Sequence, residues 1–220
     1  MGIAVVTGAN RGIGLELVRQ ISEQGVRVVA VCRHRSPGLD ALGVQVESGI
    51  ELTAPDAGSR LAARFASDEI DLLIHNAGAY LQDSLQEMDP ANLRAQFELN
   101  ALAPVLITQA LVSRLVPGAK VALVTSRMGS MSDNTSGGHY GYRMSKAALN
   151  AAGVSLACDL APRRVAVVIL HPGAVRTDMT GGQGLLEPSE SVCGLLQRID
   201  ELRLETTGRF LHQNGDVLPW

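Results

Sequence analysis

The feature that most constrains the fold is a series of short apolar runs, rich in Val, Ile and Leu, that recur along the chain. The strand-like runs are Ile3–Thr7, Val26–Cys32, Ile70–His75, Lys120–Thr125 and Arg164–Leu170. They are apolar almost without interruption, as strands must be in a parallel sheet that is covered on both faces. Two weaker strands are predicted at Val44–Leu52 and Arg209–His212.

Stretches of helical length and period separate these strands. They are predicted over Gly12–Gln24, Ala57–Ser67, Pro90–Leu115, Gly141–Ala161 and Pro188–Leu202. Strand and helix in alternation predict right-handed crossovers and an α/β fold, a Rossmann-type doubly wound parallel sheet of about seven strands with helices on both faces. Ligands of such a sheet bind beyond the carboxyl ends of its strands.

Length and composition limit the class of protein. The 220 residues suit a single domain over 1–220, and 46% hydrophobic with 19% charged residues excludes a mainly disordered chain. A net charge of −3 offers no basic face for nucleic acid. The three cysteines are too few for a disulfide framework. We find no apolar run near the length of a membrane span and no signal-peptide pattern in MGIAVVTGAN. We therefore expect a cytoplasmic protein without membrane or nucleic-acid partners.

A glycine-rich turn follows the first predicted strand and opens a helix. It reads TGANRGIG at residues 7–14, and Gly8, Gly12 and Gly14 let the backbone approach a pyrophosphate at the helix N-terminus. The spacing G-x-x-x-G-x-G differs from the common G-x-G-x-x-G fingerprint, and an ordinary glycine-rich turn is the alternative. Its place between strand and helix favours a dinucleotide site.

The end of the second strand indicates which dinucleotide is bound. A site for NAD usually carries an acid there, which hydrogen bonds the ribose 2′-hydroxyl. This segment reads Val31-Cys32-Arg33-His34-Arg35 and contains no acid. Arg33 and Arg11 are suited to pair with a 2′-phosphate, although solvated surface arginines are the alternative. The sequence therefore favours NADP(H) over NAD(H).

Two residues in YRMSK have the spacing of an acid–base pair. Tyr142 and Lys146 stand four apart on a predicted helix and share one face, although a surface helical pair has the same spacing. A tyrosine pKa near 10 is lowered by a nearby ammonium, so Lys146 is expected to lower that of Tyr142. Ser126, at the end of a strand, is placed to hold a carbonyl oxygen that Tyr142 protonates. Tyr140 has Met144 four residues on, which cannot act in this way.

With these residues the chain resembles the short-chain dehydrogenase/reductase family over nearly its whole length. The further matching segments are HNAG at 75–78, FELNALAP around Asn100, and HPGAVRTDM at 171–179. Glu51, in ELT, stands where the family usually has an Asp beside the adenine. The resemblance implies an oxidoreductase that acts on small molecules.

The resemblance also implies roles for individual residues. Tyr142 is the general acid, Lys146 binds the nicotinamide ribose, Ser126 orients the carbonyl and Asn100 holds a water that links Lys146 to solvent. Val175 and Thr177 contact the carboxamide. The residues expected to bind the cofactor are Gly8, Asn10, Arg11, Gly12, Ile13, Gly14, Arg33, Glu51, Leu52, Asn76, Ala77, Gly78, Tyr142, Lys146, Pro172, Gly173, Val175 and Thr177.

Two departures from the family pattern refine the expected function. The step from Ser126 to Tyr142 is long and, with the ending GDVLPW, resembles the branch that contains the C-factor signalling protein and the sniffer carbonyl reductase. The segment between Thr177 and Pro188 is short, which predicts an open site and broad selectivity. We expect an NADP(H)-dependent enzyme that interconverts a carbonyl compound and an alcohol; the alternative is a dinucleotide-binding signalling protein. An epimerase would need a larger substrate domain.

The resemblance implies a homodimer or homotetramer, because the helices that carry Asn100 and Tyr142 commonly form the subunit interface in relatives. His75, His139 and His171 have no metal-site spacing, so no metal is expected. His139 stays a candidate site residue because it lies on a loop beside the predicted site.

Overall fold

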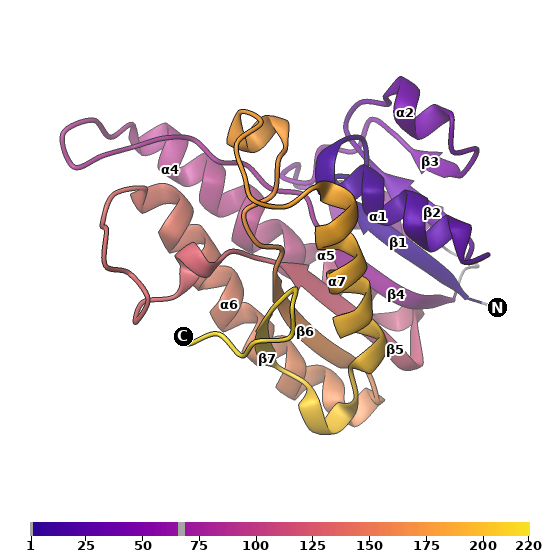
Figure 1. Ribbon diagram of the computed structural model, residues 1–220. Coiled ribbons are helices and arrows are strands. Elements are labelled where there is room, and N and C mark those ends of the chain that lie inside the picture. The colour runs from indigo at the N-terminus through magenta and orange to yellow at the C-terminus, as the bar shows by residue number, and fades with distance from the viewer. Residues whose placement is uncertain (1, 66–68) are drawn as a thin grey trace.

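The computed structural model describes residues 2–65 and 69–220, and it contains one seven-stranded parallel sheet (Figure 1). The strands lie in the order β3-β2-β1-β4-β5-β6-β7, and every neighbouring pair is parallel. Their bounds are β1 Ile3–Thr7, β2 Val28–Val31, β3 Gln45–Glu47, β4 Ile70–His75, β5 Leu115–Val124, β6 Ala166–His171 and β7 Arg209–His212. The doubly wound parallel sheet predicted from the sequence is confirmed.

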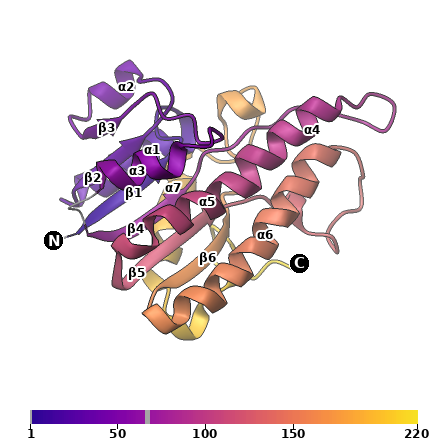
Figure 2. The same ribbon diagram turned by 180° about the vertical axis from the view of Figure 1, so that it is seen from behind.

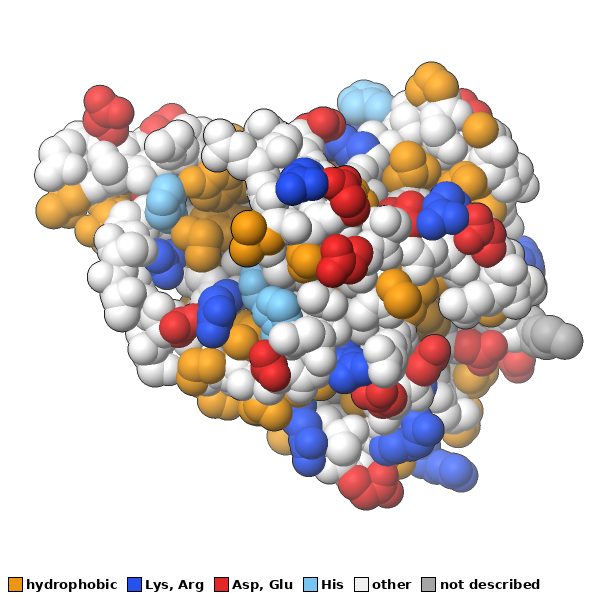
Figure 3. Space-filling view, in the orientation of Figure 1, with side chains coloured by type: hydrophobic (Ala, Val, Ile, Leu, Met, Phe, Trp, Pro, Cys, Tyr) orange, Lys and Arg blue, Asp and Glu red, His pale blue; other side chains and the backbone are white. Residues whose placement is uncertain are grey.

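Helices cover both faces of this sheet. Their bounds are α1 Gly12–Glu23, α2 Pro37–Asp40, α3 Ala57–Arg64, α4 Pro90–Phe97, α5 Ala103–Leu111, α6 Tyr140–Leu160 and α7 Pro188–Glu201. The helices α1 and α7 pack together over one face, whereas α3, α5 and α6 lie side by side over the other (Figure 2). On the face seen in Figure 3, basic side chains lie among acidic ones.

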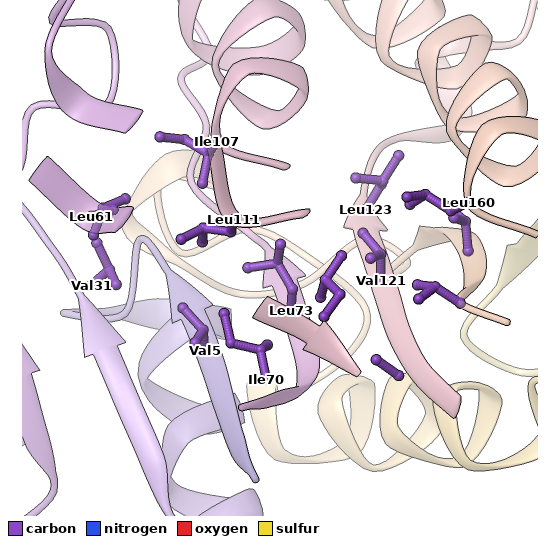
Figure 4. Packing of buried hydrophobic residues seen from close by; sticks show 14 of the residues in the cluster. Val5, Val31, Leu61, Ile70, Leu73, Ile107, Leu111, Val121, Leu123 and Leu160 are labelled. Atoms are coloured by element: carbon purple, nitrogen blue, oxygen red, sulfur yellow. The ribbon is translucent and has the colours of Figure 1, made fainter. Parts of the chain in front are cut away.

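The alternation of side chains along each strand divides the core into two layers. In β1, Val5 faces the layer under α3, α5 and α6, while Ala4 and Val6 face the layer under α1 and α7. The first layer is completed by helix residues such as Ile107 and Leu111 (Figure 4). Because both faces of each central strand are buried, Val, Ile and Leu follow one another without the polar alternation of a half-exposed strand.

Several element bounds differ from the prediction. The helix expected over Pro90–Leu115 is divided by a π-helical turn at Glu98–Leu102, and Leu115 already belongs to β5. The helix expected over Ala57–Ser67 ends at Arg64, and residues 66 and 67 lie outside the described residues. The sequence analysis missed the short helix α2, which the Ser36 hydroxyl caps by accepting a hydrogen bond from the Leu39 N–H.

One helical stretch of the described chain, Pro90–Arg114, is long and apolar enough by length and composition to cross a membrane. The sequence analysis expected no apolar segment of membrane-spanning length, and by this measure of length and composition that expectation is wrong. Its apolar residues have another use in this fold, because Ile107 and Leu111 are fully buried in the core and α5 packs against α3 and α6.

Candidate active site

A cleft of about 480 Å³ opens at the carboxyl ends of the central strands. Its walls come from the segments that follow β1, β2, β3, β4, β5 and β6, together with the first turns of α1 and α6. The predicted residues that line it are Gly8, Asn10, Arg11, Gly12, Ile13, Gly14, Arg33, Glu51, Leu52, Asn76, Ala77, Gly78, Tyr142, Lys146, Pro172 and Thr177. The fold thus brings distant parts of the chain together at one site.

The glycine turn allows β1 and α1 to approach each other closely. Gly8 has a φ of +65°, and a Cβ there would lie 2.7 Å from the Cα of Ala77. A Cβ on Gly14 would lie 2.1 Å from the carbonyl oxygen of Gly8. Side chains at these positions would therefore collide with backbone.

The loops that follow β1 and β4 are joined by side-chain hydrogen bonds. The Asn76 amide donates to the carbonyl oxygens of Thr7 (3.2 Å) and Gly8 (3.1 Å). The Thr7 hydroxyl accepts from the N–H groups of Asn76 (3.1 Å) and Ala77 (3.2 Å). Asn76 therefore holds the glycine turn in addition to lining the cleft.

Two arginines at the cleft are paired with carboxylates. Arg33 lies 3.1 Å from Glu51, and Arg11 lies 3.3 Å from Asp178 on the opposite wall. Partial burial acts to raise the pKa of Glu51, but hydrogen bonds from Arg33 and Thr53 outweigh it and hold the pKa below its ordinary value. The described first turn of α1 holds no acidic side chain, so its positive end faces the cleft uncompensated. The glycine turn, this helix end and the guanidinium groups fit a dinucleotide phosphate.

The catalytic tyrosine predicted from the sequence faces the cleft from the first turn of α6. Burial raises the pKa of Tyr142 to about 12, a hydrogen bond with Ser126 opposes the rise, and neighbouring Tyr80 adds to it. The sequence analysis expected a lowered pKa at Tyr142, and the structure contradicts this. In a low-dielectric wall the neutral phenol is favoured over the phenolate.

The predicted partner, Lys146, is buried on the next turn of the same helix. Its Nζ donates to the carbonyl oxygen of Val124 (2.9 Å) and lies 5.8 Å from the centre of the Tyr142 ring. Burial lowers the pKa of Lys146 to about 8. The Lys146 ammonium is therefore close to the Tyr142 ring, but it donates its hydrogen bond to the last residue of β5, Val124, and not to Tyr142.

Asn100 lies beneath the cleft, fully buried in the π-helical turn. Its Oδ1 accepts from the Ala79 N–H (2.7 Å), and its Nδ2 donates to the Ala79 carbonyl (2.8 Å) and the Ser145 hydroxyl (3.0 Å). A Cβ on Gly78 would lie 3.1 Å from this Oδ1 and 3.7 Å from the Lys146 Nζ. Asn100 and Lys146 thus face the same small space, and the water relay stays a prediction.

Of the described residues that were predicted to act at the site, four are not part of the cleft lining: Asn100, Ser126, Gly173 and Val175. Ser126 still contacts the site through Tyr142. Val175 is buried and forms a β-bridge with Leu186, beside which Gly173 also lies. That Gly173 and Val175 bind the cofactor stays a prediction.

The sequence analysis assigned no role to several of the lining residues. They are Val31, Cys32, His34, Ile50, Leu99, Val124, Thr125, Asp178 and Met179. Most of them directly adjoin a predicted site residue or end a predicted strand, and that adjacency is the signal that could have found them.

The histidines have separate surroundings. In the described chain no group of three or more His, Cys, Asp or Glu residues is placed to hold a metal ion. His75 is buried against Thr108, with Nε2 and Oγ1 2.8 Å apart. The rings of His171 and His212 pack edge to face. His139 contacts Tyr80 at the entrance to α6.

The family is shown by comparison with known sequences. The model of the short chain dehydrogenase family matches residues 2–185, and the chain belongs to that family. It is 40% identical over 226 residues to 1-hydroxy-2-glutathionyl-2-methyl-3-butene dehydrogenase of Rhodococcus sp. (strain AD45), with all of both chains covered. It is 46% identical over 162 residues to C-signal of Myxococcus xanthus, covering 72% of this chain and 98% of that protein.

Solved structures show the same architecture. Carbonyl reductase Sniffer of D. melanogaster is 30% identical and superposes with a TM-score of 0.93 over all of both chains. The NADPH-bound carbonyl reductase from chicken fatty liver is 28% identical, with a TM-score of 0.89 over 100% of this chain and 99% of that one. These findings confirm the predicted family and its carbonyl reductase-like branch, and they support an NADP-dependent oxidoreductase.

Proposed function

We propose that this protein is an NADP(H)-dependent oxidoreductase that interconverts a small carbonyl compound and its alcohol. The observation that carries the proposal is the shared cleft. Tyr142 and Lys146 line the same cavity as the glycine turn, and the Ser126 hydroxyl is hydrogen bonded to Tyr142. An acid–base group, a cation and a dinucleotide-type turn are thus combined at one site.

Each side chain has a defined task in the proposed reduction. The nicotinamide, when bound, supplies the hydride. Tyr142, whose raised pKa keeps the phenol protonated at neutral pH, gives its proton to the carbonyl oxygen. Ser126 donates a hydrogen bond to that oxygen and orients it. Lys146 binds the nicotinamide ribose, and its charge stabilises the negative charge that develops on the Tyr142 oxygen.

The preference for NADP(H) is supported by the arginines and by relatives. Arg33 and Arg11 line the cleft, and an exposed guanidinium can exchange a carboxylate partner for a phosphate at little cost. The chicken relative binds NADPH. We propose that the lining residues predicted from the sequence bind the cofactor, and that Arg33 contacts the 2′-phosphate.

The substrate class is an alcohol or carbonyl compound of small size. The Rhodococcus relative is named for the dehydrogenation of a hydroxylated glutathionyl compound, and the Drosophila relative is a carbonyl reductase. The short segment between Thr177 and Pro188 leaves the cleft open, which favours broad selectivity. A preference of several orders of magnitude for one compound over all close analogues would contradict this breadth.

The test follows cofactor oxidation with a panel of aldehydes, ketones, quinones and glutathionyl carbonyl compounds, with NADPH and NADH in parallel. Tyr142→Phe should abolish turnover and keep NADPH binding. Tyr140→Phe is the matched control, because Tyr140 precedes Tyr142 by two residues and lines a separate cavity. A Tyr142→Phe variant with more than about a tenth of the wild-type rate would contradict the assignment.

A second candidate is a dinucleotide-binding signalling protein, favoured by the 46% identity to C-signal. Tight NADPH binding without turnover across the panel would support it, and the search would then turn to a protein partner. Turnover that Tyr142→Phe abolishes would support the enzyme.

We also propose a homodimer through the outer face of α4, α5 and α6. Apolar side chains are exposed on these adjoining helices and on the π-helical turn between α4 and α5: Phe97, Leu102, Leu106, Met144 and Val154. A two-fold contact would cover each of these apolar residues in both copies. Leu106→Glu should yield monomers in light scattering, whereas Leu185→Glu, an exposed site outside this face, should not. A monomeric wild type would overturn the proposal.

A further inference from the structure

The first turn of α6 is capped by a side chain from a distant part of the chain. His139, the N-cap residue, has φ 52° and ψ 42° and makes no side-chain cap within the described structure. The carboxylate of Asp83 takes its place, with Oδ1 accepting from the Tyr140 N–H (2.5 Å) and Oδ2 from the Gly141 N–H (2.9 Å). The Asp83 backbone carbonyl accepts from the His139 N–H (3.3 Å). N–H groups that lack helical partners are satisfied in this way.

The packing around this carboxylate leaves it little freedom. Asp83 is 7% exposed, and a Cβ on Gly141 would lie 3.1 Å from its Oδ2 and 2.4 Å from the Nε2 of Gln96. A side chain at position 141 would therefore have to displace the buried Gln96 amide. A buried carboxylate is costly unless hydrogen bonds and a favourable field offset its desolvation, and the N-terminus of α6 provides both.

The same loop contacts Tyr142 directly. The ring of Tyr80 meets the Tyr142 ring edge to face, with 5.2 Å between their centres. The Tyr80 hydroxyl is hydrogen bonded to Nδ1 of His139 (2.8 Å). The segment from Tyr80 to Asp83 therefore contacts the start of α6 in two ways. Asp83 accepts hydrogen bonds from the backbone of that helix, and Tyr80 packs against the ring of Tyr142.

This segment continues directly from a wall of the cleft. Asn76, Ala77 and Gly78 line the cavity, and Ala79 exchanges two hydrogen bonds with Asn100. One short loop therefore joins the cleft wall to the helix that carries Tyr142.

We infer that Asp83 is a positioning residue, which holds the Tyr142 hydroxyl in register with the cleft wall by anchoring the N-terminus of α6. Asp83 is not among the described residues that line the cleft, so it acts through Tyr140 and Gly141 rather than on substrate. The inference rests on the proposed function, in which Tyr142 is the acid. A displacement of a catalytic group by about 1 Å lowers rates by about 100-fold.

The experiment compares Asp83→Ala and Asp83→Asn with Asp89→Ala. Asp89 is the matched control, because it is an exposed aspartate that caps a different helix, α4, by accepting from the Ala91 N–H (2.8 Å). Asp83→Ala should lower kcat by about 10- to 100-fold, with the KM for NADPH within about twofold of wild type. Asp83→Asn should recover part of the loss, because its amide oxygen can accept one of the two N–H groups. Asp89→Ala should keep the wild-type kcat.

Two results would overturn the inference. One is a kcat for Asp83→Ala equal to that of Asp89→Ala. The other is an equal loss in kcat and in NADPH affinity, which would indicate general disruption. If Asp83→Ala does not fold, Asp83→Asn is judged by the same two criteria. Failure of the proposed function has a different signature, because the wild type itself would then show no turnover that Tyr142→Phe abolishes.

Discussion

The guanidinium of Arg33 lies 3.1 Å from the carboxylate of Glu51, and the two side chains come from segments that follow neighbouring strands β2 and β3. The sequence analysis assigned these residues to one end of the same cofactor but did not foresee that they pair. With side chains 66% and 43% exposed, the pair contributes less than about 1 kcal/mol to stability. This weak ion pair therefore holds Arg33 at the cleft but does not prevent Arg33 from exchanging Glu51 for a phosphate group.

Removal of Arg33 should discriminate between the two dinucleotides. Arg33→Ala should weaken NADPH binding by about 10- to 100-fold, the loss of a charge-assisted contact worth about 1–3 kcal/mol, with a much smaller effect on NADH. Fluorescence titration of both cofactors measures this difference. An equal loss for both would mean that Arg33 does not contact the phosphate.

Removal of the Glu51 charge should act in the opposite direction. Glu51→Gln frees Arg33 from its partner and removes a repulsive charge near the proposed 2′-phosphate, so NADPH should bind severalfold more tightly. NADH, which lacks that phosphate, should not gain. Weaker NADPH binding in this variant would show that Glu51 contributes a necessary contact of its own.

The pH dependence of turnover should follow Lys146 rather than Tyr142. Burial raises the pKa of Tyr142 to about 12, so the phenol stays protonated in ordinary assays. Burial lowers the pKa of Lys146 to about 8, so its charge is lost as the pH rises through that value. The kcat for reduction should therefore decline above about pH 8, since the ammonium stabilises charge on the Tyr142 oxygen. A profile that is flat to about pH 10 would contradict this role.

Gly14 should not tolerate a methyl group. Alanine in place of glycine inside a helix ordinarily stabilises it by about 1 kcal/mol. At this position the Cβ would lie 2.1 Å from the Gly8 carbonyl oxygen, and overpacking of this kind costs about 1–3 kcal/mol. Gly14→Ala should therefore lower the free energy of urea unfolding and weaken NADPH binding. Gly38→Ala is the control, because its Cβ would meet only the flexible end of Leu15; equal effects of the two changes would contradict the reasoning.

Buried His75 should make the fold less stable in acid. Burial lowers its pKa from 6.5 to about 3. As the pH falls below 6.5, the unfolded chain binds a proton that the folded protein does not, so the free energy of unfolding decreases by up to about 1.4 kcal/mol per pH unit. His75→Gln, which keeps a donor for Thr108, should reduce this slope between pH 6.5 and about 5, as measured by urea titrations. Burial also lowers the pKa of His171 to about 3, so part of the pH dependence of the unfolding free energy should remain in the variant. If His75→Gln does not change this pH dependence at all, His75 is protonated in the folded protein.

Local sequence was sufficient where the structure depends on burial alone. The bounds of β1 and β4 agree with those predicted, because the buried part of each is an apolar run that ends in turn residues. The bounds of β7 also agree, although this edge strand is only partly buried. The π-helical turn at Glu98–Leu102 was not predictable in this way. Its buried Asn100 is hydrogen bonded to Ala79 and Ser145, which are distant in sequence, and no local propensity records those partners.

The sequence by itself determined the family, the parallel sheet and the residues with cleft-forming motifs, because glycine spacing, strand composition and the Tyr142–Lys146 interval are local patterns. Only the tertiary structure decided the protonation behaviour of these residues and their contacts with distant segments. The pKa of Tyr142 is raised rather than lowered because the folded chain buries the ring. Val175 is buried and bridged to Leu186, and Asp83 reaches the start of α6 from a loop that follows another strand. Desolvation and contacts between distant segments exist only after the chain has folded, so no sequence pattern contains them.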